Sequence, residues 1–246
     1  MVDREPDRGD ATATPLNVEY RVGRIAKYLT GRWLDFGCAD GGYVEALLQN
    51  GADFVSGVDV EEDRVAEAKR RALEHAEFTV FDGLNLPFDD DVFDGTFMNE
   101  VYEHVVDEAT ALVEIYRVLK PGGRLVLISP NRWFPIEGHN VTVAGKTICP
   151  APLIPWLPER MTHSWTAARN YWPSQLERDV RNAGFGIEEI GFIWPVLQTY
   201  PWLPTKGISF YQRHFRTWDQ IPGIRRFGVS TLVVGVKPAH RPAARA

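Results

Sequence analysis

The sequence has little that would cross-link the chain or hold it in a membrane. Only two of its 246 residues are cysteines, Cys38 and Cys149, which argues against a disulfide framework and favours a reducing compartment. No segment approaches the ~20 continuous apolar residues that a membrane-spanning helix needs. The first ten residues alternate acids and arginines without an apolar run, so no secretory signal is predicted. We therefore expect a soluble, cytoplasmic protein.

The remaining composition is that of a globular protein, with 44% hydrophobic and 24% charged residues. The charge is unevenly distributed, since residues 1–130 carry 13 Lys/Arg against 26 Asp/Glu and residues 131–246 carry 14 against 7. Seven of the eight tryptophans also lie in the second part. The sequence thus divides into an acidic, regular half and a basic, aromatic half.

Short apolar strands alternate with amphipathic helices along the first 130 residues. The predicted strands cover residues 33–37, 54–60, 77–81, 93–98 and 124–129, and two more follow at 186–193 and 229–236. Strict alternation of strand and helix predicts a parallel sheet with helices on both faces. The fold class is therefore α/β, with a doubly wound, mostly parallel, seven-stranded sheet.

One domain over residues 1–246 accounts for this pattern. Its ligand-binding core is predicted at residues 17–130, and residues 171–193 and 229–238 complete the sheet. Prolines and tryptophans interrupt the periodicity at 131–170 and 194–228. We expect these two insertions to fold together as an aromatic-rich cap over the strand ends.

The predicted site lies where the strands end, because ligands of open α/β sheets bind at the carboxyl edge. The small-residue bend 37–42 allows a ligand to approach the backbone closely. Asp59, after the second strand, can accept hydrogen bonds from both hydroxyls of a ribose. Asp82, after the third, can accept one from an exocyclic amine. These features predict a nucleoside pocket.

A nicotinamide dinucleotide is one alternative for this pocket. Gly37, Ala39 and Gly42 match the dinucleotide fingerprint in a degenerate form, and Tyr116 and Lys120 have the spacing of a dehydrogenase pair. However, Tyr116 falls on the apolar face of its helix, where core packing is expected. The acid Asp35 also precedes the bend, and a carboxylate suits an amino or sulfonium group better than a pyrophosphate.

At these residues the sequence resembles the class I S-adenosylmethionine-dependent methyltransferases, in the ubiquinone/menaquinone-methyltransferase-like (type 11) branch. The resemblance covers about residues 17–130. It is carried by an ordered set of motifs, namely Leu34–Gly42, Gly57–Asp59, Phe81–Gly83, Leu86–Phe88, Phe93–Asp94 with Glu103–Val105, and Leu119–Gly123. It implies a Rossmann-like methyltransferase fold, with Ala39 standing where the family usually has glycine.

The resemblance also implies a role for each matching residue. S-adenosyl-L-methionine is the implied cofactor, with its methionine end at Asp35 and the bend, its ribose at Asp59 and its adenine at Asp82. Asn99 would lie near the methyl group. The full set of predicted cofactor-binding residues is Asp35, Gly37, Ala39, Gly41, Asp59, Val60, Asp82, Gly83 and Asn99.

His139, just past the fifth strand, is the predicted catalytic residue, because a neutral imidazole is suited to take the acceptor's proton. A structural histidine in the loop is the alternative. His104 is expected to be structural, held in the helix after the fourth strand. Glu100 and His104 lie four residues apart, but no third ligand is apparent in the sequence, so no metal is predicted.

The aromatic cap is the predicted acceptor region, with Trp133, Phe134, Trp165 and Trp194 lining an apolar pocket or forming the cap's own core. Basic residues nearby favour an anionic acceptor and are compatible with peripheral membrane contact. The sequence lacks the proline motif of base methyltransferases after Asn99, which disfavours nucleic acid. We expect a methyltransferase acting on an oxygen or nitrogen of a small organic or lipid-like acceptor. The alternatives are an NAD(P)-dependent oxidoreductase and a non-catalytic cofactor-binding protein, and the sequence leaves the oligomeric state open.

Overall fold

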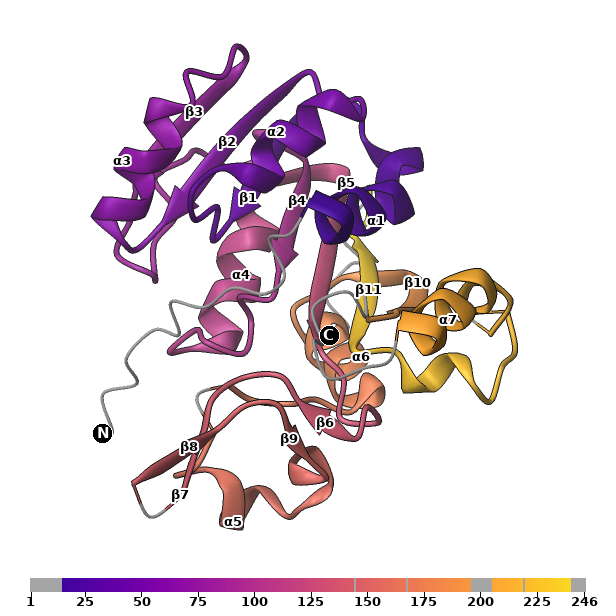
Figure 1. Ribbon diagram of the computed structural model, residues 1–246. Coiled ribbons are helices and arrows are strands. Elements are labelled where there is room, and N and C mark those ends of the chain that lie inside the picture. The colour runs from indigo at the N-terminus through magenta and orange to yellow at the C-terminus, as the bar shows by residue number, and fades with distance from the viewer. Residues whose placement is uncertain (1–14, 144, 167, 196–204, 219, 240–246) are drawn as a thin grey trace, which may run out of the picture.

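The computed structural model describes residues 15–143, 145–166, 168–195, 205–218 and 220–239. Its centre is a seven-stranded sheet in the order β10-β11-β5-β4-β1-β2-β3 (Figure 1). The strands are β1 (Arg32–Phe36), β2 (Phe54–Asp59), β3 (Ala76–Val80), β4 (Phe93–Asn99), β5 (Leu119–Pro130), β10 (Gly186–Ile193) and β11 (Ser230–Val236). All seven predicted strands are present.

The first five strands pair in parallel, whereas β11 runs antiparallel to both β5 and β10. The strand order reverses at β1, which has β2 on one side and β4 on the other. In a doubly wound sheet this switch point is the place where ligands bind. The mostly parallel, doubly wound sheet predicted from the sequence is therefore confirmed.

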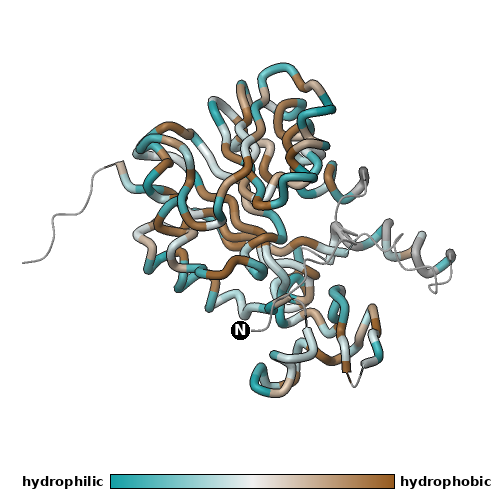
Figure 2. Tube along the Cα trace, turned by 90° about the vertical axis from the view of Figure 1, so that its left-hand side faces the viewer, coloured by the Kyte–Doolittle hydropathy of each residue, from teal (hydrophilic) through white to brown (hydrophobic). Residues whose placement is uncertain are grey.

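Helices cover both faces of the sheet. They are α1 (Pro15–Ile25), α2 (Gly42–Gln49) and α3 (Glu62–Arg70) on one face, and α4 (Glu108–Val118) and α6 (Pro173–Asn182) on the other. Each face has its own apolar layer, because side chains of a strand alternate between the two faces. Figure 2 shows hydrophobic strands enclosed between more hydrophilic helices.

The two insertions form short elements beside the sheet. The first contains β6 (Ile136–Glu137), β7 (Val141–Val143), β8 (Lys146–Ile148), β9 (Ala151–Pro152), η3 (Ile154–Trp156) and α5 (Glu159–Thr162). The second contains α7 (Thr205–Trp218) and η5 (Arg225–Phe227), and its residues 196–204 and 219 lie outside the described residues. The insertions meet where Asn131 Nδ2 donates to Arg226 O and where the rings of Trp133 and Phe227 lie 6.1 Å apart.

Helix α7 differs from the irregular segment that the sequence predicts. Its ring contacts join Phe210 to His214 and to Trp218, and Tyr211 to Trp218. These spacings of four, seven and eight residues place the rings on one side of a helix.

No described helix is long and apolar enough to cross a membrane.

We expect Gly95→Ala to destabilise the fold. Gly95 pairs with Trp33 across β4 and β1, and an added Cβ would lie 2.5 Å from the Trp33 ring. Because overpacking a dense core costs roughly 1–3 kcal/mol, urea unfolding should show a loss of that size. The control is Gly23→Ala in α1, where a Cβ meets nothing within 4 Å and helix propensity predicts a gain of up to ~1 kcal/mol. Equal stability of the two variants would contradict this packing.

Candidate active site at the carboxyl edge of the sheet

The bend between β1 and α2 is tied to the neighbouring strand through its backbone. The amides of Gly37 and Cys38 donate to Val58 O at 2.8 and 2.9 Å. Gly37 and Gly41 have φ values of +83° and +82°, a region that glycine adopts without steric cost. A Cβ on Gly37 would collide with Val101. The glycines thus let the bend approach both a ligand and the loop after β4.

Ala39 lies in the left-handed region as well, with φ +46°. An L-residue is strained there. Its amide donates to Asp59 Oδ2 at 2.9 Å, so one of the predicted site residues helps to hold another. The bend keeps its tight turn although Ala39 replaces the glycine that the motif usually has.

Asp35, near the end of β1, is the most unusual acid of this edge. Asp35 is 2% exposed, and its Oδ2 has no hydrogen-bond partner among the described residues. Burial, followed by the charge of Asp59, raises the pKa of Asp35 to about 8. A cationic group that reached this oxygen would meet an acceptor with no competing protein donor.

Asp59, the last residue of β2, is also buried, at 8% exposed. Its Oδ2 accepts from the Ala39 amide and its Oδ1 from the Glu61 amide at 3.0 Å. Each carboxylate oxygen has two lone pairs, so both can still accept from a ligand. The next residue, Val60, is 57% exposed and presents an apolar surface beside Gly83, where an added Cβ would lie 3.3 Å from Val60 Cγ1.

Asp82 turns toward its own loop. It accepts from the Leu84 and Asn85 amides at 2.8 and 2.7 Å and from Asn85 Nδ2 at 2.8 Å. These bonds, with those from Asn85 first, lower the pKa of Asp82 to about 2. The residue is exposed, and its contact with an adenine edge stays a prediction.

Asn99 is the last residue of β4 and lies beside a buried cation, Arg21, that the sequence did not indicate. Arg21 of α1 donates from Nη1 to Asn99 Oδ1 and to Glu100 Oε1, both at 2.7 Å, and from Nη2 to Ser230 Oγ at 3.2 Å. Burial alone would raise the pKa of Glu100, but Arg21 and Ser230 outweigh it and lower this pKa. Arg21 therefore fastens α1 to the strand edge at the predicted site.

His139 is held by Glu137, a residue that sequence reasoning missed. Glu137 Oε1 accepts from the His139 amide at 3.0 Å and lies 2.8 Å from His139 Nδ1. Glu137 is 1% exposed, and its other oxygen accepts from Asn170. Because a carboxylate only accepts hydrogen bonds, Nδ1 donates, and in the neutral imidazole Nε2 carries the lone pair.

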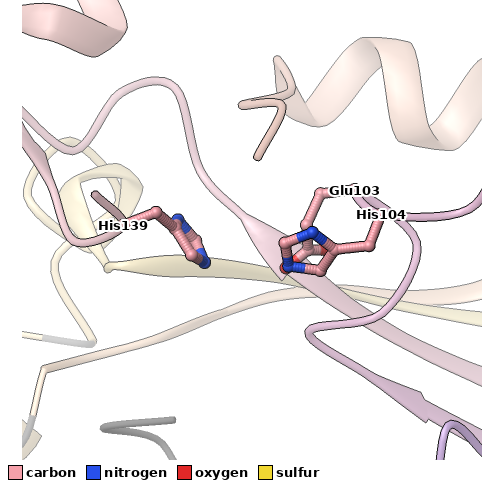
Figure 3. Close-up of side chains that lie close together, drawn as sticks. All are labelled: Glu103, His104 and His139. Carbon is pink, nitrogen blue, oxygen red and sulfur yellow. The ribbon is translucent and has the colours of Figure 1, made fainter. Parts of the chain in front are cut away.

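His139 also lies against the loop that follows β4. Potential ligand atoms of Glu103, His104 and His139 all lie within 4.8 Å of one another, and the two imidazole rings lie edge-on with centroids 5.6 Å apart (Figure 3). Burial, followed by the charge of Glu100, raises the pKa of Glu103 well above its ordinary value. The loop thus brings to His139 the neighbours that the sequence could not show.

The expectation that His104 sits in a helix is wrong. His104 is exposed and lies in a turn, where its amide donates to Val101 O at 2.9 Å. Helix α4 starts only at Glu108, because Asp107 caps it by accepting from the Thr110 amide at 3.0 Å. The His104 side chain is thus positioned by a turn and not by a helix.

The predicted acceptor residues do not form one cluster in the described structure. The Trp133 ring lies 5.2 Å from that of Trp172, whereas the Trp194 ring lies 6.3 Å from that of Tyr211. Trp194 is 7% exposed and Trp133 is 37% exposed. Phe134 and Trp165 are half-buried in the first insertion. A pocket shared by all four side chains stays a prediction.

The Tyr116 and Lys120 pair has a structural role. The Tyr116 ring packs edge-on against Phe185, with centroids 5.0 Å apart. Lys120 Nζ bonds both carboxylate oxygens of Asp94, at 2.8 and 2.9 Å. The feature that favoured a nicotinamide oxidoreductase is thus explained by packing and an ion pair.

Comparisons with known proteins agree with this geometry. The type 11 methyltransferase domain family matches residues 34–127. A demethylmenaquinone methyltransferase of Clavibacter sepedonicus is 28% identical over 255 residues, covering 99% of this chain and 91% of that protein. A ubiquinone biosynthesis O-methyltransferase of Parvibaculum lavamentivorans is 28% identical over 162 residues, covering 65% and 60%.

Solved structures show the same fold. A crystal structure of an S-adenosylmethionine-dependent methyltransferase from Mesorhizobium loti aligns with a TM-score of 0.61 and 18% identity, over 89% of this chain and 97% of that one. The buried, unpartnered oxygen of Asp35 beside the glycine bend fits the cationic methionine end of such a cofactor. Residues 34–127 therefore match a methyltransferase domain, and the chain is similar to methyltransferases over nearly its whole length.

Proposed function

We propose that the protein transfers the methyl group of S-adenosylmethionine to an oxygen or nitrogen of a small organic or lipid-like acceptor. The observation that carries this proposal is the placement of His139, whose Nδ1 is held by buried Glu137 on the loop after β5. The names of the two curated relatives, which refer to menaquinone and ubiquinone, support a lipid-like acceptor.

On the cofactor side, Asp35 would accept from the amino group of the methionine end, with the backbone of Gly37, Ala39 and Gly41 around it. Asp59 would accept from the ribose hydroxyls. Val60, Asp82 and Gly83 would flank the adenine, and Asn99 would lie toward the methyl group. When bound, the cofactor supplies a methyl group already activated by its sulfonium. The protein's main task is then to position the acceptor, which can contribute roughly 7–11 kcal/mol.

On the acceptor side, His139 Nε2 would take the proton of the attacking hydroxyl or amine. Glu137 holds the tautomer that this step needs, because its carboxylate keeps the proton on Nδ1. Glu137 is thus a positioning residue. It stabilises the imidazolium that forms when Nε2 has accepted the proton.

A cavity of about 470 Å³ near the end of β10 supports an anionic or apolar acceptor. Its apolar lining includes Trp133, Trp172 and Phe192, and its basic lining consists of Arg225 and Arg226. Cavities of a few hundred Å³ lined in this way hold small organic ligands. The same residues suit peripheral contact with an anionic membrane surface, whereas the net charge of −6 disfavours nucleic acid.

Binding of S-adenosylhomocysteine should release protons at pH 7. With a pKa of about 8, the free Asp35 is mostly protonated at this pH, and an arriving amino cation lowers that pKa. Calorimetric titration in two buffers of different ionisation enthalpy measures the released protons. Asp35→Asn should lose up to one released proton per bound ligand. The same proton release from both proteins would contradict the role of Asp35.

Asp59→Ala should weaken the binding of S-adenosylhomocysteine by about 1–3 kcal/mol, because it removes hydrogen bonds to a charged acceptor. Calorimetry or equilibrium dialysis gives the affinity. Asp89→Ala is the matched control, since Asp89 is exposed in the loop before β4. An affinity equal to that of the wild type would refute the ribose assignment.

Incubation with labelled S-adenosylmethionine and a panel of hydroxyl and amine acceptors, quinols included, tests the transfer. His139→Ala should lower turnover by roughly 10²-fold or more, the usual contribution of a positioned base, with S-adenosylhomocysteine affinity intact. His163→Ala, which removes an exposed histidine of the first insertion, should retain full turnover. No product from any acceptor would favour a non-catalytic cofactor-binding protein instead.

A further inference from the structure

The loop after β4 and the loop after β5 bring three metal-ligating side chains to one point. Glu103, His104 and His139 each offer one ligand atom, and these atoms lie within 4.8 Å of one another (Figure 3). Two imidazoles and one carboxylate form a ligand set that binds zinc at catalytic sites, where a fourth position stays open for water or substrate. We propose that Glu103, His104 and His139 bind a divalent cation of the zinc class.

A second, independent observation comes from Glu103 itself. The residue is completely buried, and its Oε2 accepts from Ser129 Oγ at 2.9 Å. Its Oε1 is also buried and has no hydrogen-bond partner among the described residues. A buried carboxylate oxygen without a donor is costly, and a cation bound beside it would remove that cost.

His139 is prepared for ligation in the way that metal sites usually prepare an imidazole. A ligating histidine almost always donates its other ring N–H to a carboxylate or carbonyl, which fixes the ring and its tautomer. Glu137 supplies this carboxylate at 2.8 Å from Nδ1 and is itself bonded by Asn170. Nε2 is therefore the ring nitrogen that we assign as the ligand atom.

The remaining adjustment is small. Ligand atoms around tetrahedral zinc lie about 3.4 Å apart, since each bond is about 2.1 Å long. The three ligand atoms, within 4.8 Å of one another, need to approach by at most about 1.4 Å. His104 can provide this movement, because it is exposed and lies in a turn.

The site's position connects the cation to the proposed transfer, and this part rests on the proposed function. Val101, two residues before Glu103, is the side chain that a Cβ on Gly37 would strike, so the loop abuts the bend at the cofactor side. A hydroxyl in the open position would ligate the cation, which would lower the pKa of that hydroxyl so that its proton passes to solvent before the transfer. This ligand would favour an oxygen acceptor. With the cation bound, His139 Nε2 is a ligand, and it acts as a base only in the metal-free protein.

The test measures metal binding without cofactor or acceptor. Full-length protein is stripped with a chelator and titrated by calorimetry with ZnCl₂, and separately with CoCl₂ while the visible absorption of cobalt is followed. We expect one equivalent to bind, with an intense cobalt band typical of tetrahedral coordination, and MgCl₂ not to compete because imidazole is a poor magnesium ligand.

The variants identify the ligands. His139→Ala and Glu103→Gln should each weaken zinc binding at least 10-fold, and Glu137→Gln should weaken it 10- to 100-fold, the usual effect of losing a partner of a ligating histidine. Circular dichroism confirms that each variant is folded. His163→Ala is the matched control, and its zinc affinity should be unchanged. Zinc affinities of His139→Ala and Glu103→Gln equal to that of the wild type, or no stoichiometric binding at all, would overturn the proposal.

The two proposals fail separately. S-adenosylhomocysteine binding and methyl transfer by the stripped protein, without zinc binding at these residues, would reject the metal site and leave the methyltransferase function standing. Stoichiometric zinc binding that the ligand variants abolish, with no methylated product from any acceptor, would support the metal site and count against the transfer.

Discussion

The carboxyl group of Asp35 is the constraint on which this site depends. It lies buried at the point where the strand order reverses, and one of its oxygens has no donor among the described residues. A second acid, Asp59, is buried on the adjacent strand and is satisfied by the amides of Ala39 and Glu61. Burial and the charge of Asp59 disfavour the ionised form of Asp35, and a cationic ligand would offset both effects. The glycine bend leaves the space for that ligand.

The same arrangement recurs at the end of β4. Glu100 is satisfied by Arg21 and Ser230, whereas Glu103 retains an oxygen without a donor. Asp35 and Glu103 thus each retain a buried oxygen without a donor, near a second acid, Asp59 or Glu100, that has partners. Burial and the neighbouring acid raise the pKa of both Asp35 and Glu103. In the two proposals, a positive group would offset that cost at each place.

The sequence was sufficient for the parts of this structure that depend on local pattern. Alternation of strands and helices predicts the sheet, and the positions of Asp35 and Asp59 follow because parallel strands end at one edge. Contacts between distant segments were not predictable. Glu103 and His139 are 36 residues apart, and the segment between them includes β5 and an aperiodic loop. Arg21 reaches Asn99 across 78 positions, a pairing that no spacing rule indicates.

Helix α1 precedes the sheet in the chain, yet its side chains are buried against the sheet and bond to its strand ends. Val22 and Ile25 are fully buried, and Arg21, at 2% exposed, carries its charge to the ends of β4 and β11. Lifting the helix would expose Val22 and Ile25 and would separate Arg21 from its partners Asn99, Glu100 and Ser230. We therefore expect helix α1 to open together with the central strands rather than to fray independently.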